Sequence, residues 1–237
     1  SYPRVLLDIN TQRDFLRAKG ALPVANRTAL MPRLRELMNW ARQEGIPVIS
    51  AMESHRPTEI FHDLPPHCLD GTPGQQKVSC TLLPRRLLVE VDNTLALPQD
   101  LLERYHQVIF RKRSADVFSN PKADRLLTEL RARQFVVFGV AAERSVRTLV
   151  LGLLARHKRV VVVQDACGIW NTTERDMAFQ LMLAKGAILV SCEQIIGSPA
   201  PPEGDNGFVR PRKRGALLAV DRPLRQKSRS RRRMTPA

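Results

Sequence analysis

The chain has 237 residues, 43% of them hydrophobic, and a formal net charge of +15 at pH 7. Its length is enough for one substantial α/β domain, and its apolar content excludes a chain that is disordered throughout. No apolar run approaches the roughly 20 residues that a membrane-spanning helix needs, so we expect no membrane partner.

Two features of the sequence favour a cytoplasmic protein. The first residues read as the start of a strand, Arg4–Leu7, and not as a signal peptide. The four cysteines show neither a CxxC spacing nor the density of a disulfide scaffold, so reduced thiols are expected.

Strand and helix signals alternate along the first 195 residues. The first helix has leucines near helical spacing, and Asn26 stands where an N-cap residue belongs. The strands are apolar runs without alternation, which is typical of parallel strands buried on both faces. We therefore predict a three-layer α/β/α sandwich with a mainly parallel, Rossmann-like sheet and right-handed crossovers. The predicted strands are 5–9, 46–51, 108–110, 135–138, 160–163 and 187–190, and the predicted helices are 27–42, 122–133, 143–156 and 173–185.

Residues 54–100 interrupt this alternation. The segment contains six prolines and has one short strand candidate, 87–91. A long loop region inside a compact domain is often functional.

The pattern ends after Gly197, which gives a predicted domain over residues 1–197 and a basic, Pro/Arg-rich, disordered tail over 198–237. Residues 201–237 hold eleven Lys or Arg against three Asp or Glu, so this part carries +8 of the net charge. The tail could bind an anionic polymer weakly through counterion release, or it could be a solvated segment without a partner.

Polar residues follow two of the predicted strands, at the edge where open parallel sheets bind ligands. Asn10 follows the first strand; it can form hydrogen bonds but cannot hold a proton for transfer. Lys112 follows the strand 108–110 and could orient a carboxylate or stabilise an anion. The alternatives are that Asn10 shapes a turn and that Lys112 lies on a solvated face.

Glu53, His55 and His67 form a candidate metal site. Glu53 and His55 are two residues apart after the second strand, and a loop histidine could close the set. One carboxylate and two imidazoles with a water suit a divalent transition metal, zinc above all. His62 is a fourth candidate, and polar loop residues that never meet are the alternative.

Ser145 lies where the strand 135–138 gives way to a helix through a short turn of small residues. This geometry aims backbone N–H groups and one side chain at a point above the sheet. A serine is a weak nucleophile unless a base takes its proton, and the Gly-x-Ser-x-Gly elbow is absent. A structural residue in the first turn is therefore the alternative.

Taken in order, these segments resemble the isochorismatase-like superfamily of cysteine hydrolases over residues 4–197. Asn10–Phe15 resembles the family's Asp-x-Gln-x-Asp-Phe opening, and Gly139–Val146 resembles Gly-Val-Ala-Thr-Asp-x-Cys-Val. The inserted segment is similar to nicotinamidases: Glu53–Pro57 resembles Asp-x-His-x-Pro, and Pro66–Gly74 resembles Pro-His-Cys-x-x-Gly-Thr-x-Gly.

The resemblance implies an Asp–Lys–Cys triad, in which cysteine attacks an amide or related carbonyl. Only Lys112 matches; Asn10 stands at the aspartate position and Ser145 at the cysteine position. It further implies an oxyanion hole beside a cis peptide at Val140–Ala141, and zinc held at positions 53, 55 and 67. Because serine needs a stronger base than a thiol and asparagine supplies none, the resemblance does not extend to the cysteine mechanism.

Two hypotheses about function follow. In the first, the protein is a hydrolase of small amide-like substrates in which a metal at Glu53, His55 and His67 activates water. In the second, it is a catalytically inactive homologue that binds a small ligand or metal in the inherited pocket. The resemblance also implies a small-molecule ligand and a homo-oligomer in either case.

Overall fold

The computed structural model describes residues 1–92 and 94–202. Its centre is a seven-stranded sheet in which every neighbouring pair is parallel, in the order β3-β4-β2-β1-β5-β6-β7. The strands are β1 (Val5–Ile9), β2 (Val48–Glu53), β3 (Arg86–Val89), β4 (Gln107–Lys112), β5 (Phe135–Val140), β6 (Val160–Gly168) and β7 (Ile188–Val190).

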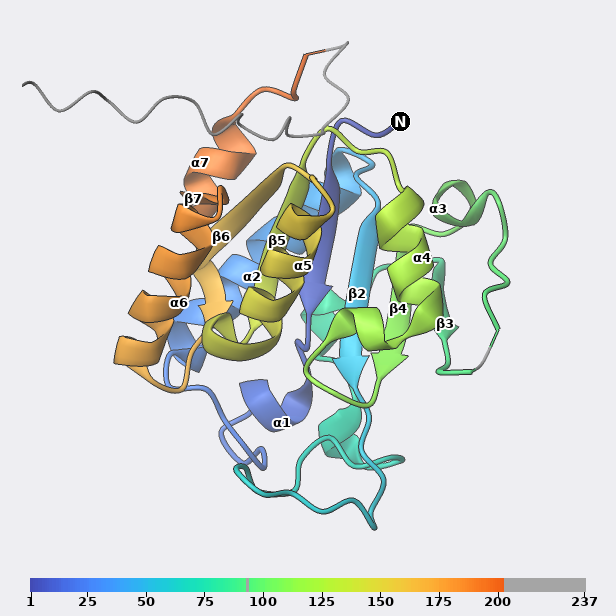
Figure 1. Cartoon of the computed structure of the whole chain (residues 1–237). Helices are drawn as coiled ribbons and strands as arrows, with labels where there is room; N and C mark the ends of the chain where they lie inside the picture. Colours follow the sequence, from blue (N-terminus) through green and yellow to red (C-terminus); the bar gives the residue numbers. More distant parts are fainter. Residues whose placement is uncertain (93, 203–237) are drawn as a thin grey trace, which may run out of the picture.

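Helices cover both faces of this sheet (Figure 1), as the apolar, non-alternating strands predict. The helices α2 and α7 pack with the apolar cluster of one face, and α4, α5 and α6 pack with the cluster of the other. This arrangement confirms the predicted three-layer sandwich. The helices are α1 (Arg13–Leu16), α2 (Arg27–Gln43), α3 (Leu101–Arg104), α4 (Pro121–Glu129), α5 (Arg147–Ala155), α6 (Thr172–Ala184) and α7 (Cys192–Gly197).

Several elements differ from the sequence-based bounds. The helix predicted to reach residue 133 ends at Glu129, and β6 extends five residues beyond the predicted 163 because it continues to pair with β5 through Gly168. Asn26 precedes α2 but makes no cap; its amide instead bonds Cys167 O and Ile169 N across the fold. Tertiary contacts therefore replace the predicted local role of this side chain.

In its described residues, the segment 54–100 forms only 3₁₀ turns and β3. Its first part lies below the carboxyl ends of the central strands, whereas β3 is an edge strand of the sheet (Figure 1). All four cysteines are unpaired in the structure. Among the described residues, no helix has the length and apolar character to cross a membrane.

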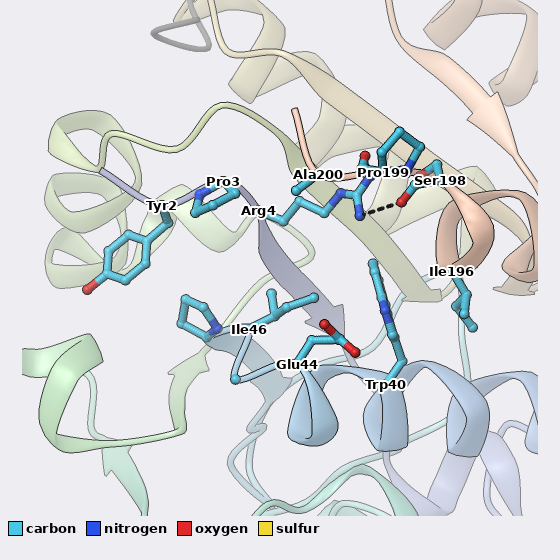
Figure 2. A pocket seen from close by; sticks show the side chains of 12 residues that line it. Tyr2, Pro3, Arg4, Trp40, Glu44, Ile46, Ile196, Ser198, Pro199 and Ala200 are labelled. Atoms are coloured by element: carbon cyan, nitrogen blue, oxygen red, sulfur yellow. Dashed lines mark hydrogen bonds between the residues drawn. The ribbon is translucent and has the colours of Figure 1, made fainter. Parts of the chain in front are cut away.

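At the amino-terminal edge of the sheet, Arg4 anchors the segment that follows α7 (Figure 2). Its guanidinium bonds Ser198 O at 3.1 Å, Ser198 Oγ at 2.7 Å and Pro199 O at 2.6 Å, and it lies over the ring of Trp40. The residues that follow α7 are thereby fixed to the domain up to this point. The predicted disordered tail lies, from residue 203 on, outside the described residues.

Candidate functional site

Four polar side chains meet at the carboxyl edge of the sheet because four parallel strands end there. Asn10 follows β1, Glu53 ends β2, and Lys112 ends β4. Ser145 lies in the single π-helical turn Ala142–Val146, between β5 and α5. All four residues are buried.

Glu53 is the common partner of the other three. Its Oε1 accepts hydrogen bonds from Asn10 Nδ2 at 2.7 Å and Ser145 Oγ at 3.2 Å, and it lies 3.1 Å from Lys112 Nζ. Asn10 Nδ2 is also 3.1 Å from Ser145 Oγ. The triad positions that the sequence singled out therefore converge on a carboxylate that comes from the predicted metal site.

Asn10 reaches this position with a left-handed backbone conformation, φ 51°. Its amide nitrogen has to face Glu53, because the amide oxygen would repel a carboxylate. As a result Asn10 Oδ1 is buried, and it has no hydrogen-bond partner among the described residues. The amide is thus complementary to the negative charge on Glu53.

The second carboxylate oxygen of Glu53 faces two histidines. Glu53 Oε2 lies 3.1 Å from His67 Nε2 and 3.3 Å from His55 Nε2. The ligand atoms of the three residues all lie within 4.8 Å of one another, and all three residues are buried. His62 is exposed and lines the same pocket but lies outside this group.

The outer nitrogens of both histidines are also held. His67 Nδ1 donates to Pro65 O at 2.7 Å, since a carbonyl only accepts, and His55 Nδ1 lies 2.9 Å from Glu59 Oε1. If Nδ1 carries the proton, neutral imidazole presents a lone pair at Nε2, directly opposite the carboxylate. A positive species, either a metal ion or an additional proton, is required between such groups. The donor set fits a divalent metal, and the hydrogen bonds at Nδ1 are those that orient metal-binding histidines.

Charge interactions set the protonation of the cluster. Burial alone would raise the pKa of the Glu53 carboxyl, but the Lys112 ammonium and the hydrogen bonds from both histidines hold it well below its usual range. Burial lowers the pKa of Lys112, against the attraction of Glu53. Burial would also lower the pKa of His55, but hydrogen bonds to Glu53 and Glu59 raise it. Glu53 is therefore an anion at neutral pH.

A pocket of about 280 Å³ opens above Glu53, His55, His67 and Ser145. Phe61 and Trp170 contribute aromatic surface, and the half-buried Arg144 contributes a guanidinium. The side chain of Arg144 has no hydrogen-bond or ion-pair partner in the described part of the chain. A cis peptide bond joins Val140 and Ala141 at the position where the resemblance placed one. The pocket is thus small, partly aromatic and basic at one wall.

The sequence profile of the isochorismatase domain matches residues 4–194. The chain belongs to the isochorismatase family.

Individual members of the isochorismatase family match over most of the chain. The nicotinamidase of Escherichia coli K12 is 26% identical, with 79% of this chain and 94% of that protein covered. Among solved structures, the pyrazinamidase of Pyrococcus horikoshii, determined in complex with zinc, has a TM-score of 0.63, with 23% identity over 80% of this chain and 99% of that one. The nicotinamidase/pyrazinamidase of Bacillus subtilis has a TM-score of 0.64, with 18% identity over 79% of this chain and 99% of that one.

Two residues that the sequence analysis did not select help to build this isochorismatase-family site. Gln12 bonds both backbone groups of Glu53, donating to its O and accepting from its N at 2.8 Å each. Glu59 holds His55. Local spacing reveals neither contact: residues 55–59 form a turn and not a helix, and the contact between Gln12 and Glu53 depends on the pairing of β1 with β2.

Proposed function

We propose that this chain hydrolyses small amide-like substrates, and that its reactive centre is formed by Glu53, His55, His67 and Lys112 and not by a nucleophile at position 145. The observation that carries this proposal is that the two carboxylate oxygens of Glu53 have different partners. One oxygen of its carboxylate faces Lys112, and the other faces both histidines.

Glu53, His55 and His67 would hold the metal, and the relative determined with zinc supports a divalent ion here. When bound, such an ion lowers the pKa of a coordinated water and polarises a carbonyl oxygen. The chain's own contribution is orientation: Pro65 O and Glu59 fix the two imidazoles through Nδ1, and Gln12 fixes the backbone of Glu53. The identity of the ion as zinc is part of the proposal.

The remaining polar groups stabilise the carboxylate of Glu53 and the charge that develops on the substrate. Lys112 neutralises the buried carboxylate, and Asn10 completes its hydrogen bonding without competing for a proton. Backbone N–H groups next to the Val140–Ala141 peptide are candidate donors for an oxyanion that develops on the substrate carbonyl. Ser145 donates its hydroxyl proton to Glu53 and acts here as a positioning residue.

The size of the pocket and the relatives both favour a small substrate. A volume of about 280 Å³ suits a single ring with its amide, and Phe61 and Trp170 can contact the faces of such a ring. The named relatives act on nicotinamide or pyrazinamide, which are compounds of this kind. Nicotinamide is therefore the first substrate to assay.

A comparison of three variants tests this function. Turnover of nicotinamide, followed by ammonia release with added zinc, should fall about 100-fold in Glu53→Gln and in His67→Ala. Ser145→Ala should stay within about 10-fold of the parent, because the serine is not the nucleophile. Equal loss in Ser145→Ala would contradict the proposal.

The inactive-homologue hypothesis predicts a different result in the same experiment. It is favoured by Asn10 and Ser145, which supply neither a base nor a thiolate at the triad positions. In that case the parent protein binds zinc and the amide but releases no ammonia, and all variants are equally inactive.

A further inference from the structure

A second pocket, of about 410 Å³, lies on the face of the sheet opposite to Glu53 and Lys112. Its floor includes Met52 of β2 and Arg111 of β4, each of which directly precedes one of those residues. Successive side chains of a strand point to opposite faces, so this pocket is separated from the candidate active site by the sheet. The register pairs Met52 of β2 with Arg111 of β4, and it pairs Leu88 of β3 with Ile109, two residues before Arg111. These four side chains therefore lie on the same face of the sheet.

The wall of this pocket is strongly basic. Arg13, Arg86, Arg111 and Lys77 line it, and none of its described lining residues is acidic. Lys77 is neutralised by Asp8, with Nζ 2.7 Å from Oδ2. The three arginines provide the remaining positive charge.

Two of these arginines, Arg13 and Arg111, each have a hydrogen-bond donor without an acceptor among the described residues. The Nε atoms of Arg13 and Arg111 are both buried, and neither has a hydrogen-bond partner among the described residues. Arg111 has one ion pair, between Nη1 and the exposed Glu90 at 3.4 Å. Leaving a buried donor unpaired costs about 1–3 kcal/mol, and each of these two pocket-lining guanidinium groups lacks an acceptor for its Nε within the described residues.

The rest of the lining is apolar. Met52, Leu82, Leu88 and Ile109 contribute side-chain surface, and Leu88 is 42% exposed. The Nε–Nη edge of a guanidinium matches the two oxygens of a phosphate or carboxylate. A pocket that combines such edges with an apolar floor is complementary to an anionic group attached to an apolar body.

We propose that this pocket binds a small organic anion, a phosphate monoester or a carboxylate on an apolar ring, with Arg13 and Arg111 as the residues that hold the anionic group. This site is independent of the hydrolase function proposed above. It stands whether or not the protein turns over an amide.

Calorimetric titration with phenyl phosphate tests the site, because this probe joins the two chemistries in one molecule. Arg13→Lys and Arg111→Lys keep the charge but lose the planar fork, so each should raise Kd about 10-fold or more. Lys185→Gln removes one exposed charge at the end of α6, on the other side of the sheet, and should change Kd less than about 2-fold. Inorganic phosphate should bind more weakly than phenyl phosphate, since it lacks the apolar body.

A second pair of variants tests the same site without changing Arg13 or Arg111. Leu88→Glu places an acid at the exposed part of the floor and should abolish binding. Arg144→Gln alters the guanidinium of the other pocket and should leave binding unchanged. The proposal is overturned if phenyl phosphate does not bind, if the lysine variants bind like the parent, or if Arg144→Gln removes the binding.

Discussion

The residue that organises the candidate site is Glu53. In the resemblance its position belongs to an aspartate of the metal set, but the longer glutamate also reaches Asn10 and Ser145. The Glu53 carboxylate thereby contacts both the predicted triad positions and the two histidines of the predicted metal site. The residues at positions 10 and 53 are chemically matched, because the amide of Asn10 can donate to the carboxylate of Glu53 and an aspartate at position 10 could not.

Asn10→Asp tests this match. It would place a second carboxylate at the position of Nδ2, 2.7 Å from Glu53 Oε1, and we expect it to lower the free energy of unfolding by about 2–4 kcal/mol at pH 7. In a Glu53→Gln background the same change should cost less by at least about 1 kcal/mol. Urea denaturation of the four proteins measures the coupling, and strictly additive effects would show that the two positions do not interact.

Two of the buried cysteines are poorly suited to act as a nucleophilic thiolate. Burial raises the pKa of the Cys167 thiol to about 12, and burial next to Glu53 raises the pKa of Cys68 even further from its usual range. A thiol is protonated below its pKa, so at pH 8 both remain in the unreactive form. Iodoacetamide should leave Cys68 and Cys167 of the native protein unmodified, while all four cysteines react after unfolding. Peptide mass spectrometry reads this out; rapid native alkylation of Cys68 would reopen a cysteine mechanism.

At the scale of elements, apolar runs predicted the five inner strands because these are largely buried and carry a continuous apolar signal. The edge strands β3 and β7 are partly exposed, and short apolar runs indicated them too. The ends of the strands were less predictable. Lys112 and Glu53 belong to β4 and β2 although both are charged, since each is paired with its neighbour in the sheet and with the other's side chain. Such pairing joins residues that are 59 positions apart in the sequence, and hydrophobic periodicity within one segment cannot predict it.

The packing of β1 against β5 depends on Gly139. This residue pairs with Ile9 and has φ 120°, and an added Cβ would collide with the Ile9 backbone. Gly139→Ala should therefore destabilise the protein by about 3 kcal/mol or more. Gly45→Ala is the matched control: its φ is 64°, but nothing lies within 4 Å, so about 1 kcal/mol is expected. Equal losses in urea denaturation would contradict a close contact at Gly139.

At the scale of the whole molecule, the parallel sheet explains why residues from four distant segments meet. The sequence predicted which side chains stand at strand ends, but not that Glu53 would connect the two sets, because its reach depends on side-chain length in three dimensions. Of the net charge of +15, residues 201–237 carry +8, and the charged residues among them lie beyond the described part of the chain.

Truncation after Pro202 tests the predicted role of the basic tail. It removes a net +8 while keeping the contacts of Arg4 with Ser198 and Pro199. If the tail binds anionic polymers, the truncated protein should elute from heparin at a clearly lower salt concentration. Unchanged elution would assign the retention to the folded domain.

We propose that the chemistry of this protein lies with Glu53, His55 and His67. Metal content after zinc loading and gel filtration, measured by mass spectrometry of the elements, tests it most directly. We expect about one zinc per chain for the parent and for Ser145→Ala, and a large loss of bound zinc in Glu53→Gln and His67→Ala. A parent protein that retains no zinc, or variants that retain as much as the parent, would contradict it.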